Sequence, residues 1–204
     1  AIRYQLDGSG YRAINDGELD QSGCPITVYQ GSEQPLCSGY ELMNDLDFDT
    51  NQDGVIDAND DYWDSGAGWT AIGISSTPFN ATFEGNGHVI NNMFIYRPGN
   101  SQVGLFGSIN NAQIHQLGLS GSLMSVTGRS SVGALVGYVQ DDNIVNASYN
   151  TGLVTGSSSN VGGLLGSADD STNLTLNLVE GDPVSTMTSG KNPLFWYQND
   201  DDSW

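Results

Sequence analysis

Short runs of alternating apolar and polar residues recur along this chain, separated by Gly, Ser, Asn and Thr. NIVNASY (143–149) and TLNLVEG (175–181) are examples, and FNATFEGNGHVINNMFIY (79–96) alternates on both sides of a GNG turn. Alternation with period two is typical of a half-buried strand, whereas small polar residues and glycine favour turns over helix interiors. The pattern therefore predicts many short strands joined by turns.

A repeat is superimposed on this alternation. The segments VGLFG, VGALVG and VGGLLG begin at intervals of 29 residues, at Val103, Val132 and Val161. Other apolar positions keep nearly the same interval: Ile114, Ile144 and Leu174 each begin an alternating run, and VTG occurs at Val126 and at Val154. A fixed period over short strands indicates repeats that stack on one another.

The expected fold is all-β: a parallel β-helix (β-solenoid) of about four coils with a non-repetitive N-terminal cap. Each unit would form one coil, and residues 79–96 would lie in the first. The glycines are expected where corners need positive φ, or where coils stacked about 4.8 Å apart leave no room for a side chain. The open sheet edges at the two ends of such a stack require caps.

Charge narrows the choice of partners. Five basic residues face 24 acidic ones, which gives a net charge of −19. Such a surface repels polyanions, so nucleic acid is not expected as a partner. A run of about 18 apolar residues, long enough to span a membrane, does not occur, so no membrane insertion is expected. The chain looks like part of a larger polypeptide whose export signal lies elsewhere or has been removed.

The acidic residues are densest in DTNQDGVIDAND (49–60), which follows the spacing of an EF-hand calcium loop. Gly54 falls at the sharp turn, and Asp60 stands where a longer Glu is usual, as in dockerin-type loops, which this segment also resembles. Ile56 is expected to face inward and tie the loop to the core. The predicted Ca²⁺ ligands are Asp49, Asn51, Asp53, the backbone carbonyl of Val55, Asp57 and Asp60.

The alternative to a calcium site is a solvated acidic turn. Eight carboxylates lie between Asp45 and Asp64 without a Lys or Arg among them, and without a cation they would repel one another. We therefore favour Ca²⁺ as the cofactor, in a structural role. Long amphipathic helices, which a calcium sensor would need, are not predicted on either side of the loop.

Cys24 and Cys37 bracket a segment marked by Pro and Gly. A disulfide between them would close a loop of about 14 residues and stabilise the fold by roughly 3 kcal/mol; two unpaired thiols are the alternative. The expected division of the chain is then an N-terminal cap with the disulfide and the calcium loop (1–68), the solenoid (69–185), and a C-terminal cap or the start of a following segment (186–204).

Aromatic residues cluster beside the acidic loop, at Tyr62, Trp63 and Trp69, and near the end of the chain, at 195–197 and Trp204. Exposed, the first cluster could bind a ligand by stacking on sugar rings; buried, it would plug the end of the solenoid. We favour the plug, because both clusters lie where caps are needed.

Catalysis has little support in the sequence, and no catalytic residue is predicted. His88 and His115 lie in different coils without zinc-ligand spacing. The acidic pairs 141–142 and 169–170 look like one solvent-facing turn repeated. A polysaccharide-degrading enzyme, which would use paired carboxylates, is the less favoured alternative.

The order of three motifs resembles a known group. YELMNDLDFDTNQDGVIDANDDYWDSGAGWTAIG, then FNATFEGNGHVINNMFI, then the V-G-L-F-G series is similar to bacterial surface proteins with GLUG repeats, over about residues 39–166. The resemblance implies a secreted or cell-surface β-helical protein, often a module of an adhesin. The leading hypothesis is thus a non-catalytic, Ca²⁺-stabilised module for adhesion or spacing. The alternative is a module that binds a host-cell or surface glycan or protein through exposed aromatics.

Overall fold

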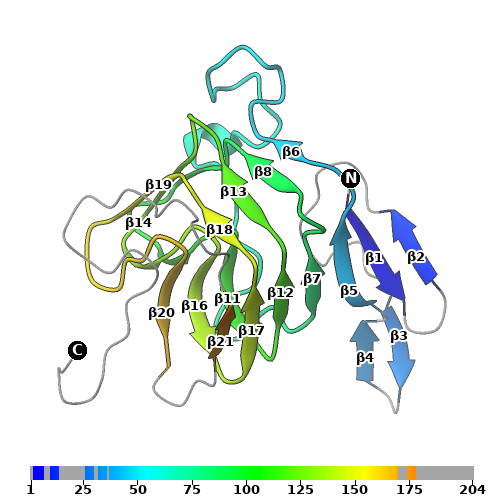
Figure 1. Cartoon of the computed structure of the whole chain (residues 1–204). Helices are drawn as coiled ribbons and strands as arrows, with labels where there is room; N and C mark the ends of the chain where they lie inside the picture. The colour runs from blue at the N-terminus through cyan, green and yellow to red at the C-terminus, as the bar shows by residue number, and fades with distance from the viewer. Residues whose placement is uncertain are drawn as a thin grey trace.

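The computed structural model describes the backbone of residues 2–6, 10–13, 26–29, 32–35, 37–169 and 174–177, and side chains within residues 39–169 and at residues 174 and 175. The described chain is built of short strands (Figure 1), and one short 3-10 helix, η2, covers Asp64–Gly66. No helix in these ranges is long and apolar enough to cross a membrane. The fold is all-β, as the alternation predicts.

Six sheets organise the strands. The largest contains, in spatial order, β2 (Gly10–Ala13), β1 (Ile2–Leu6), β5 (Cys37–Leu42), β7 (Thr82–Glu84), β12 (Gln113–His115), β17 (Asn143–Asn146) and β21 (Leu174–Asn177). The second contains β18 (Tyr149–Asn150), β13 (Gly118–Ser120), β8 (Val89–Asn91) and β6 (Leu46–Asp47). The third contains β19 (Leu153–Gly156), β14 (Ser125–Gly128) and β9 (Phe94–Tyr96). The others are β10 (Ser101–Val103) with β15 (Ser130–Val132), β11 (Phe106–Asn110) with β16 (Val136–Gln140) and β20 (Leu165–Ala168), and the hairpin of β3 (Ile26–Tyr29) and β4 (Ser32–Pro35).

Five of these sheets join successive repeats. Within each, a strand pairs in parallel with the strand one unit further along the chain: β7 with β12 and β12 with β17, or β9 with β14 and β14 with β19. The units 82–110, 113–140 and 143–168 each contribute to all five sheets, the third unit through a bridge between Val132 and Val161 in the β10–β15 sheet. The parallel sheets and their repeat spacing give a solenoid-like fold.

The core consists of columns of apolar side chains that run from one unit to the next. Ile95, Val126 and Val154 occupy one register and are each at most 1% exposed. The valines of the glycine-containing repeat form another column, and they are also buried: Val103, Val132 and Val161. The repeat interval thus places like side chains on top of one another in the core.

The parallel sheets begin earlier than the expected boundary at residue 69. β5 pairs in parallel with β7, and β6 with β8, although both strands lie in the segment expected to be a non-repetitive cap. On its other edge β5 pairs with β1, which runs antiparallel and is followed by β2. This antiparallel pair forms one end of the largest sheet. Cys24 and residues 178–204, which include the expected C-terminal cap, lie outside the described residues, as does the side chain of Cys37.

The corners of the coils use residues other than the repeat glycines for positive φ. Gln102, Ser131 and Asn160, spaced 29 residues apart, have φ of 61°, 50° and 63°, all in the left-handed region. The glycines at Gly104 and Gly133 do not have positive φ, so that part of the sequence expectation is wrong for them. Glycine is required at these positions because neighbouring backbone leaves no room for a side chain: a Cβ on Gly133 would lie 2.3 Å from the Val136 carbonyl oxygen.

Candidate calcium site

The acidic loop, residues 49–60, lies between β6 and η2 and projects at the top of the molecule (Figure 1). Phe48, just before it, is 1% exposed and donates its N–H to the carbonyl of Asn91, the last residue of β8, at 3.0 Å. Ile56 is partly buried and packs against the core, as predicted. The loop is therefore held at its base by a strand and an aromatic side chain, and within its span by Ile56.

Asp49 organises the first half of the loop. It is 7% exposed, and its two carboxylate oxygens accept the N–H of Asp53 at 3.1 Å and of Gly54 at 2.9 Å. Two left-handed residues make this turn, Gln52 with φ of 60° and Gly54 with φ of 84°. Glycine adopts this conformation at no steric cost, which accounts for its place at the sharp turn.

Asp60 closes the loop. It is 6% exposed, and its Oδ1 accepts the N–H of Thr50 at 2.7 Å while its Oδ2 accepts the N–H of Asp57 at 2.9 Å. Desolvation raises the pKa of this carboxyl, but hydrogen bonds from the backbone of Asp57, Thr50 and Asn51 outweigh it, so the pKa of Asp60 is lowered overall. The short side chain at the last ligand position thus bridges the two ends of the loop.

The other predicted ligands are more accessible. Asn51 and Asp53 are exposed, and Asp57 is intermediate. Asn51 Oδ1 accepts the N–H of Asp53 at 3.0 Å, Asp53 Oδ1 that of Val55 at 3.0 Å, and Asp57 Oδ1 that of Asn59 at 2.8 Å. Each of these three side chains therefore accepts a hydrogen bond from the backbone two residues later in the chain. The Val55 side chain points to solvent and is 54% exposed.

The loop carboxylates have no basic neighbour in the part of the chain whose side chains are described. The ion pairs in this part of the chain involve other residues: His88 with Asp45, Arg97 with Asp64, and His115 with Glu84. Across the same residues, no three or more His, Cys, Asp or Glu side chains converge closely enough to hold a metal ion. The predicted calcium ligands thus share one loop and follow the expected order along it. Their side-chain oxygens accept hydrogen bonds from backbone N–H groups of the same loop.

Aromatic side chains pack where the loop meets the core. The ring centroids of Phe48 and Tyr62 are 4.5 Å apart, and both rings lie 5.9 Å from that of Trp69. Trp69 is 9% exposed, and its indole N–H donates to the Leu105 carbonyl at 3.1 Å. The Trp69 ring is therefore packed against other aromatic rings, and its N–H is hydrogen-bonded. This fits a residue that closes the end of the core and does not fit one that stacks on a ligand.

Trp63 differs from Trp69. It is intermediate in exposure and stacks on Phe94, with centroids 5.7 Å apart and ring planes 17° apart. Tyr62 is also intermediate, but it packs against the core. Of the three aromatics expected as ligand-binding residues, Trp63 is the one that extends onto an outer face of the solenoid-like body.

Two contacts that anchor the loop region were not predicted from sequence. Arg97 donates to the Asp64 carboxylate at 2.8 Å, to the Gly68 carbonyl at 3.0 Å and to Thr70 Oγ1 at 2.8 Å. On the other side, Asp45 Oδ1 accepts the N–H of Val89 at 2.9 Å. Arg97 could have been suspected of pairing with the acidic segment, because the chain has only five basic residues. Nothing in the sequence distinguishes Asp45 from its acidic neighbours.

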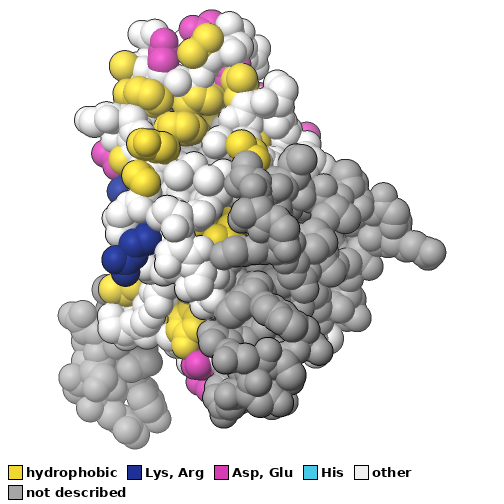
Figure 2. Space-filling model, turned by 90° about the vertical axis from the view of Figure 1, so that its left-hand side faces the viewer, with side chains coloured by type: hydrophobic (Ala, Val, Ile, Leu, Met, Phe, Trp, Pro, Cys, Tyr) yellow, Lys and Arg dark blue, Asp and Glu magenta, His cyan; other side chains and the backbone are white. Residues whose placement is uncertain are grey.

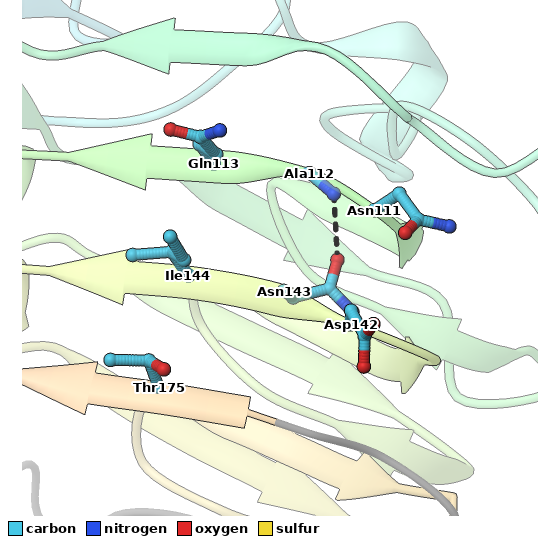
Figure 3. A pocket seen from close by; sticks show the side chains of 7 residues that line it. All are labelled: Asn111, Ala112, Gln113, Asp142, Asn143, Ile144 and Thr175. Atoms are coloured by element: carbon cyan, nitrogen blue, oxygen red, sulfur yellow. Dashed lines mark hydrogen bonds between the residues drawn. The ribbon is translucent and has the colours of Figure 1, made fainter.

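A pocket of about 360 Å³ lies at a corner of the largest sheet, and none of the described residues that line it belongs to the acidic loop (Figure 3). Gln113, Ile144 and Thr175 project from neighbouring strands along one wall. Asn143, 3% exposed, accepts the N–H of Ala112 at 2.9 Å, so its amide holds the corner. Asp142 is the one carboxylate among the described residues that line the pocket, so these residues do not bring together the paired acids of a glycosidase.

The acidic turn at 141–142 is exposed, and Asp141 has φ of 43°. Asp169 is exposed as well, and its N–H donates to the Val139 carbonyl at 3.0 Å, whereas residue 170 lies outside the described residues. The acidic residues described at these two positions therefore face solvent, as predicted for a repeated turn.

The fold and the loop define an all-β protein of stacked parallel repeats with an acidic loop at one side. No family model matches the chain, and no solved structure matches it. The chain is 29% identical over 174 residues to Halomucin of Haloquadratum walsbyi, covering 80% of this chain and 2% of that protein. It is 33% identical over 100 residues to a "Putative Gly-rich membrane protein" of Evansella cellulosilytica, covering 48% of this chain and 10% of that protein. Neither name denotes an enzyme.

Proposed function

We propose that this chain is a non-catalytic, Ca²⁺-stabilised module of a secreted or cell-surface protein, serving in adhesion or as a spacer. In this proposal the described sheets belong to a closed parallel β-helix. Residues 1–68 form its N-terminal cap, in which β5 and β6 already pair in parallel with the first coil, and residues 186–204 form a C-terminal cap or the start of a following segment. The main support for the proposal is the acidic loop, which is attached to the hydrophobic core through Phe48 and Ile56.

The donor set suits calcium, which takes about six to eight oxygen ligands. Five oxygen-bearing side chains and one backbone carbonyl fall at the required positions of the loop. A carboxylate oxygen has two lone pairs, so most of those that accept one N–H still have one for a cation. Asp49 and Asp60 are buried carboxylates without a basic partner among the described residues, and a cation between them would relieve their repulsion.

The position of the loop indicates a structural role. Phe48 and Trp69, on either side of it in the chain, lie in the hydrophobic core, so that fixing the loop also fixes where the chain enters and leaves it. The flanking elements, β6 and η2, are only two and three residues long, which leaves no pair of long helices to open as in a calcium sensor.

The surface location rests on the comparisons and on the motif resemblance. The names of the two relatives are those of a mucin and of a membrane protein. This chain spans a small fraction of each, which supports a module within a longer polypeptide. The resemblance to GLUG-repeat proteins, carried by the motifs quoted above, points in the same direction.

Thermal unfolding with Ca²⁺ or with excess chelator tests the proposal. A ligand that binds only the folded state at 100 times its Kd stabilises by about 2.7 kcal/mol, which corresponds to a rise in Tm of roughly 5–11 °C for a chain of this size. We expect a rise of this order with Ca²⁺, and equal melting curves in calcium and in chelator would refute the proposal.

Matched variants separate calcium binding from hydrogen bonding within the loop. Asp53→Asn keeps a side-chain oxygen that can accept the Val55 N–H but removes a charge from a ligand position. Asp61→Asn removes one charge at an exposed neighbour outside the ligand positions. We expect Asp53→Asn to lose most of the calcium-dependent rise and Asp61→Asn to keep it; equal loss in both variants would reduce the effect to general charge screening.

A further inference from the structure

The β9–β14–β19 sheet presents an outer face made of two columns of side chains. The register aligns Phe94 with Ser125 and Leu153 in one column, and Tyr96 with Thr127 and Thr155 in the other. The residues between these columns, Ile95, Val126 and Val154, are buried and point into the core. We call the two outer columns the β9–β14–β19 face.

Aromatic and hydroxyl groups are segregated along this face. Trp63 extends the first column at its aromatic end, where it stacks on Phe94. Tyr96 is 55% exposed, and Leu153 at the opposite end is 38% exposed. Thr127 lies between these ends and is half-buried. The face therefore offers a flat ring surface next to hydrogen-bonding groups.

Basic side chains gather at the same place. Arg97 follows Tyr96, and Arg129 lies two residues after Thr127, at the end of β14. They are the two Lys or Arg residues within 39–169. Figure 2 shows hydrophobic and basic side chains on this side of the molecule, with acidic ones at the top, beside the upper basic group and at the bottom. Among the side chains that the structure describes, this is where a negatively charged group meets cations.

The two arginines have different surroundings. Arg97 is engaged with Asp64 and with backbone carbonyls, as described above. Arg129 is exposed, and its guanidinium has no hydrogen-bond or ion-pair partner among the described residues. A free guanidinium presents a planar set of donors that matches a carboxylate. The face thus has one cation available to a ligand.

We propose that the β9–β14–β19 face binds an oligosaccharide that carries a carboxylate, such as one containing a uronic acid. The Tyr96 ring would stack on the apolar face of a sugar, Thr127 and Thr155 would bond its hydroxyl groups, and Arg129 would pair with the carboxylate. This site is separate from the calcium loop and does not depend on it.

The size of the face favours a small ligand over a protein. Three strands about 4.8 Å apart and a few residues of about 3.3 Å each define an area of roughly 200 Å². A stable protein–protein interface needs about 800 Å² on each partner. A peptide that adds as a strand would use a sheet edge, whereas this surface is a sheet face. An oligosaccharide fits both the area and the chemistry.

The test uses the 204-residue chain in saturating calcium, so that the state of the acidic loop is fixed. The probes are a glucuronic-acid-containing oligosaccharide, the same oligosaccharide with its carboxyl groups reduced to alcohols, and a short acidic peptide, each titrated by calorimetry. The variants are Tyr96→Ala and Arg129→Gln. Ile74→Ala, at an apolar residue that is 58% exposed outside this face, is the matched control.

We expect the acidic oligosaccharide to bind, the reduced one to bind at least tenfold more weakly, and Tyr96→Ala and Arg129→Gln each to weaken binding at least tenfold, with Ile74→Ala unchanged. An unchanged Tm in each variant verifies that the fold is intact. Absence of binding, equal binding of the reduced oligosaccharide, equal binding of the acidic peptide, or wild-type affinity in both face variants would each overturn the proposal.

Discussion

Replacing Gly133 by alanine tests whether the repeat glycines are required by the approach of neighbouring coils. A Cβ at this position would lie 2.3 Å from the Val136 carbonyl oxygen, 2.6 Å from the Gly166 nitrogen and 2.7 Å from the Leu164 carbonyl oxygen. All three are backbone atoms of the ladder that joins β16 to the following unit, so no flexible side chain can move aside. The backbone itself must shift, and parallel hydrogen bonds are strained with it.

Overpacking of a close-packed interior costs about 1–3 kcal/mol, and a contact with backbone on two coils belongs at the upper end of that range. For a chain of this size, each kcal/mol lowers Tm by roughly 2–4 °C. We therefore expect Gly133→Ala to lower Tm by about 6–12 °C, measured by circular dichroism or calorimetry in calcium-containing buffer.

The matched control is Gly99→Ala, at a turn where an added Cβ would meet nothing within 4 Å and where φ is not positive. There the substitution restricts the unfolded chain without a clash, so Tm is expected to stay the same or rise slightly. If Gly133→Ala and Gly99→Ala melted at the same temperature, the close approach of the coils would not be the reason for the repeat glycines.

Two further predictions concern the corners and the base of the acidic loop. The pKa of Asp45 is lowered, mainly by the hydrogen bond from the Val89 N–H. The ionised Asp45 carboxylate therefore stabilises the folded state at pH values above the unfolded pKa of about 3.9, and this stabilisation is lost as the pH falls through the lower pKa of the folded state. Wild type should therefore lose more stability than Asp45→Asn between about pH 4 and pH 2 in urea unfolding, and parallel acid profiles would contradict this. Asn143→Ala should cost about 1–3 kcal/mol in the same assay, because the buried N–H of Ala112 loses its acceptor; exposed Asn100→Ala, the control, should cost much less, and equal costs would count against the corner role.

The repeat was readable from sequence because the core is built in columns. Val103, Val132 and Val161 recur at a constant interval since each must lie above the last, and the same holds for the strands that pair around them. β5 and β6 were missed as members of the parallel sheets because they lack the glycine-containing tag. Their pairing with β7 and β8 depends on backbone register, which a side-chain pattern of two short strands does not specify.

The acidic loop could be located from its spacing, but its attachments could not. The ligand order fixes which residues share the loop, whereas the contact between Asp45 and Val89 joins positions 44 residues apart and leaves no local signal. Burial of Trp69 likewise depends on where the Leu105 carbonyl lies. Corner residues with positive φ escaped detection because polar residues such as Gln102 and Ser131 occupy them in place of glycine.

The register of the parallel sheets has a consequence for how such a chain changes over generations. Successive units, offset by 28–31 residues, bond to one another through the same five sheets. Duplication of about 30 codons would then insert one layer and lengthen the stack by about 4.8 Å, with the acidic loop and the antiparallel pair at its start left in place. Genes built this way can adjust the length of the encoded stack in small, equal steps.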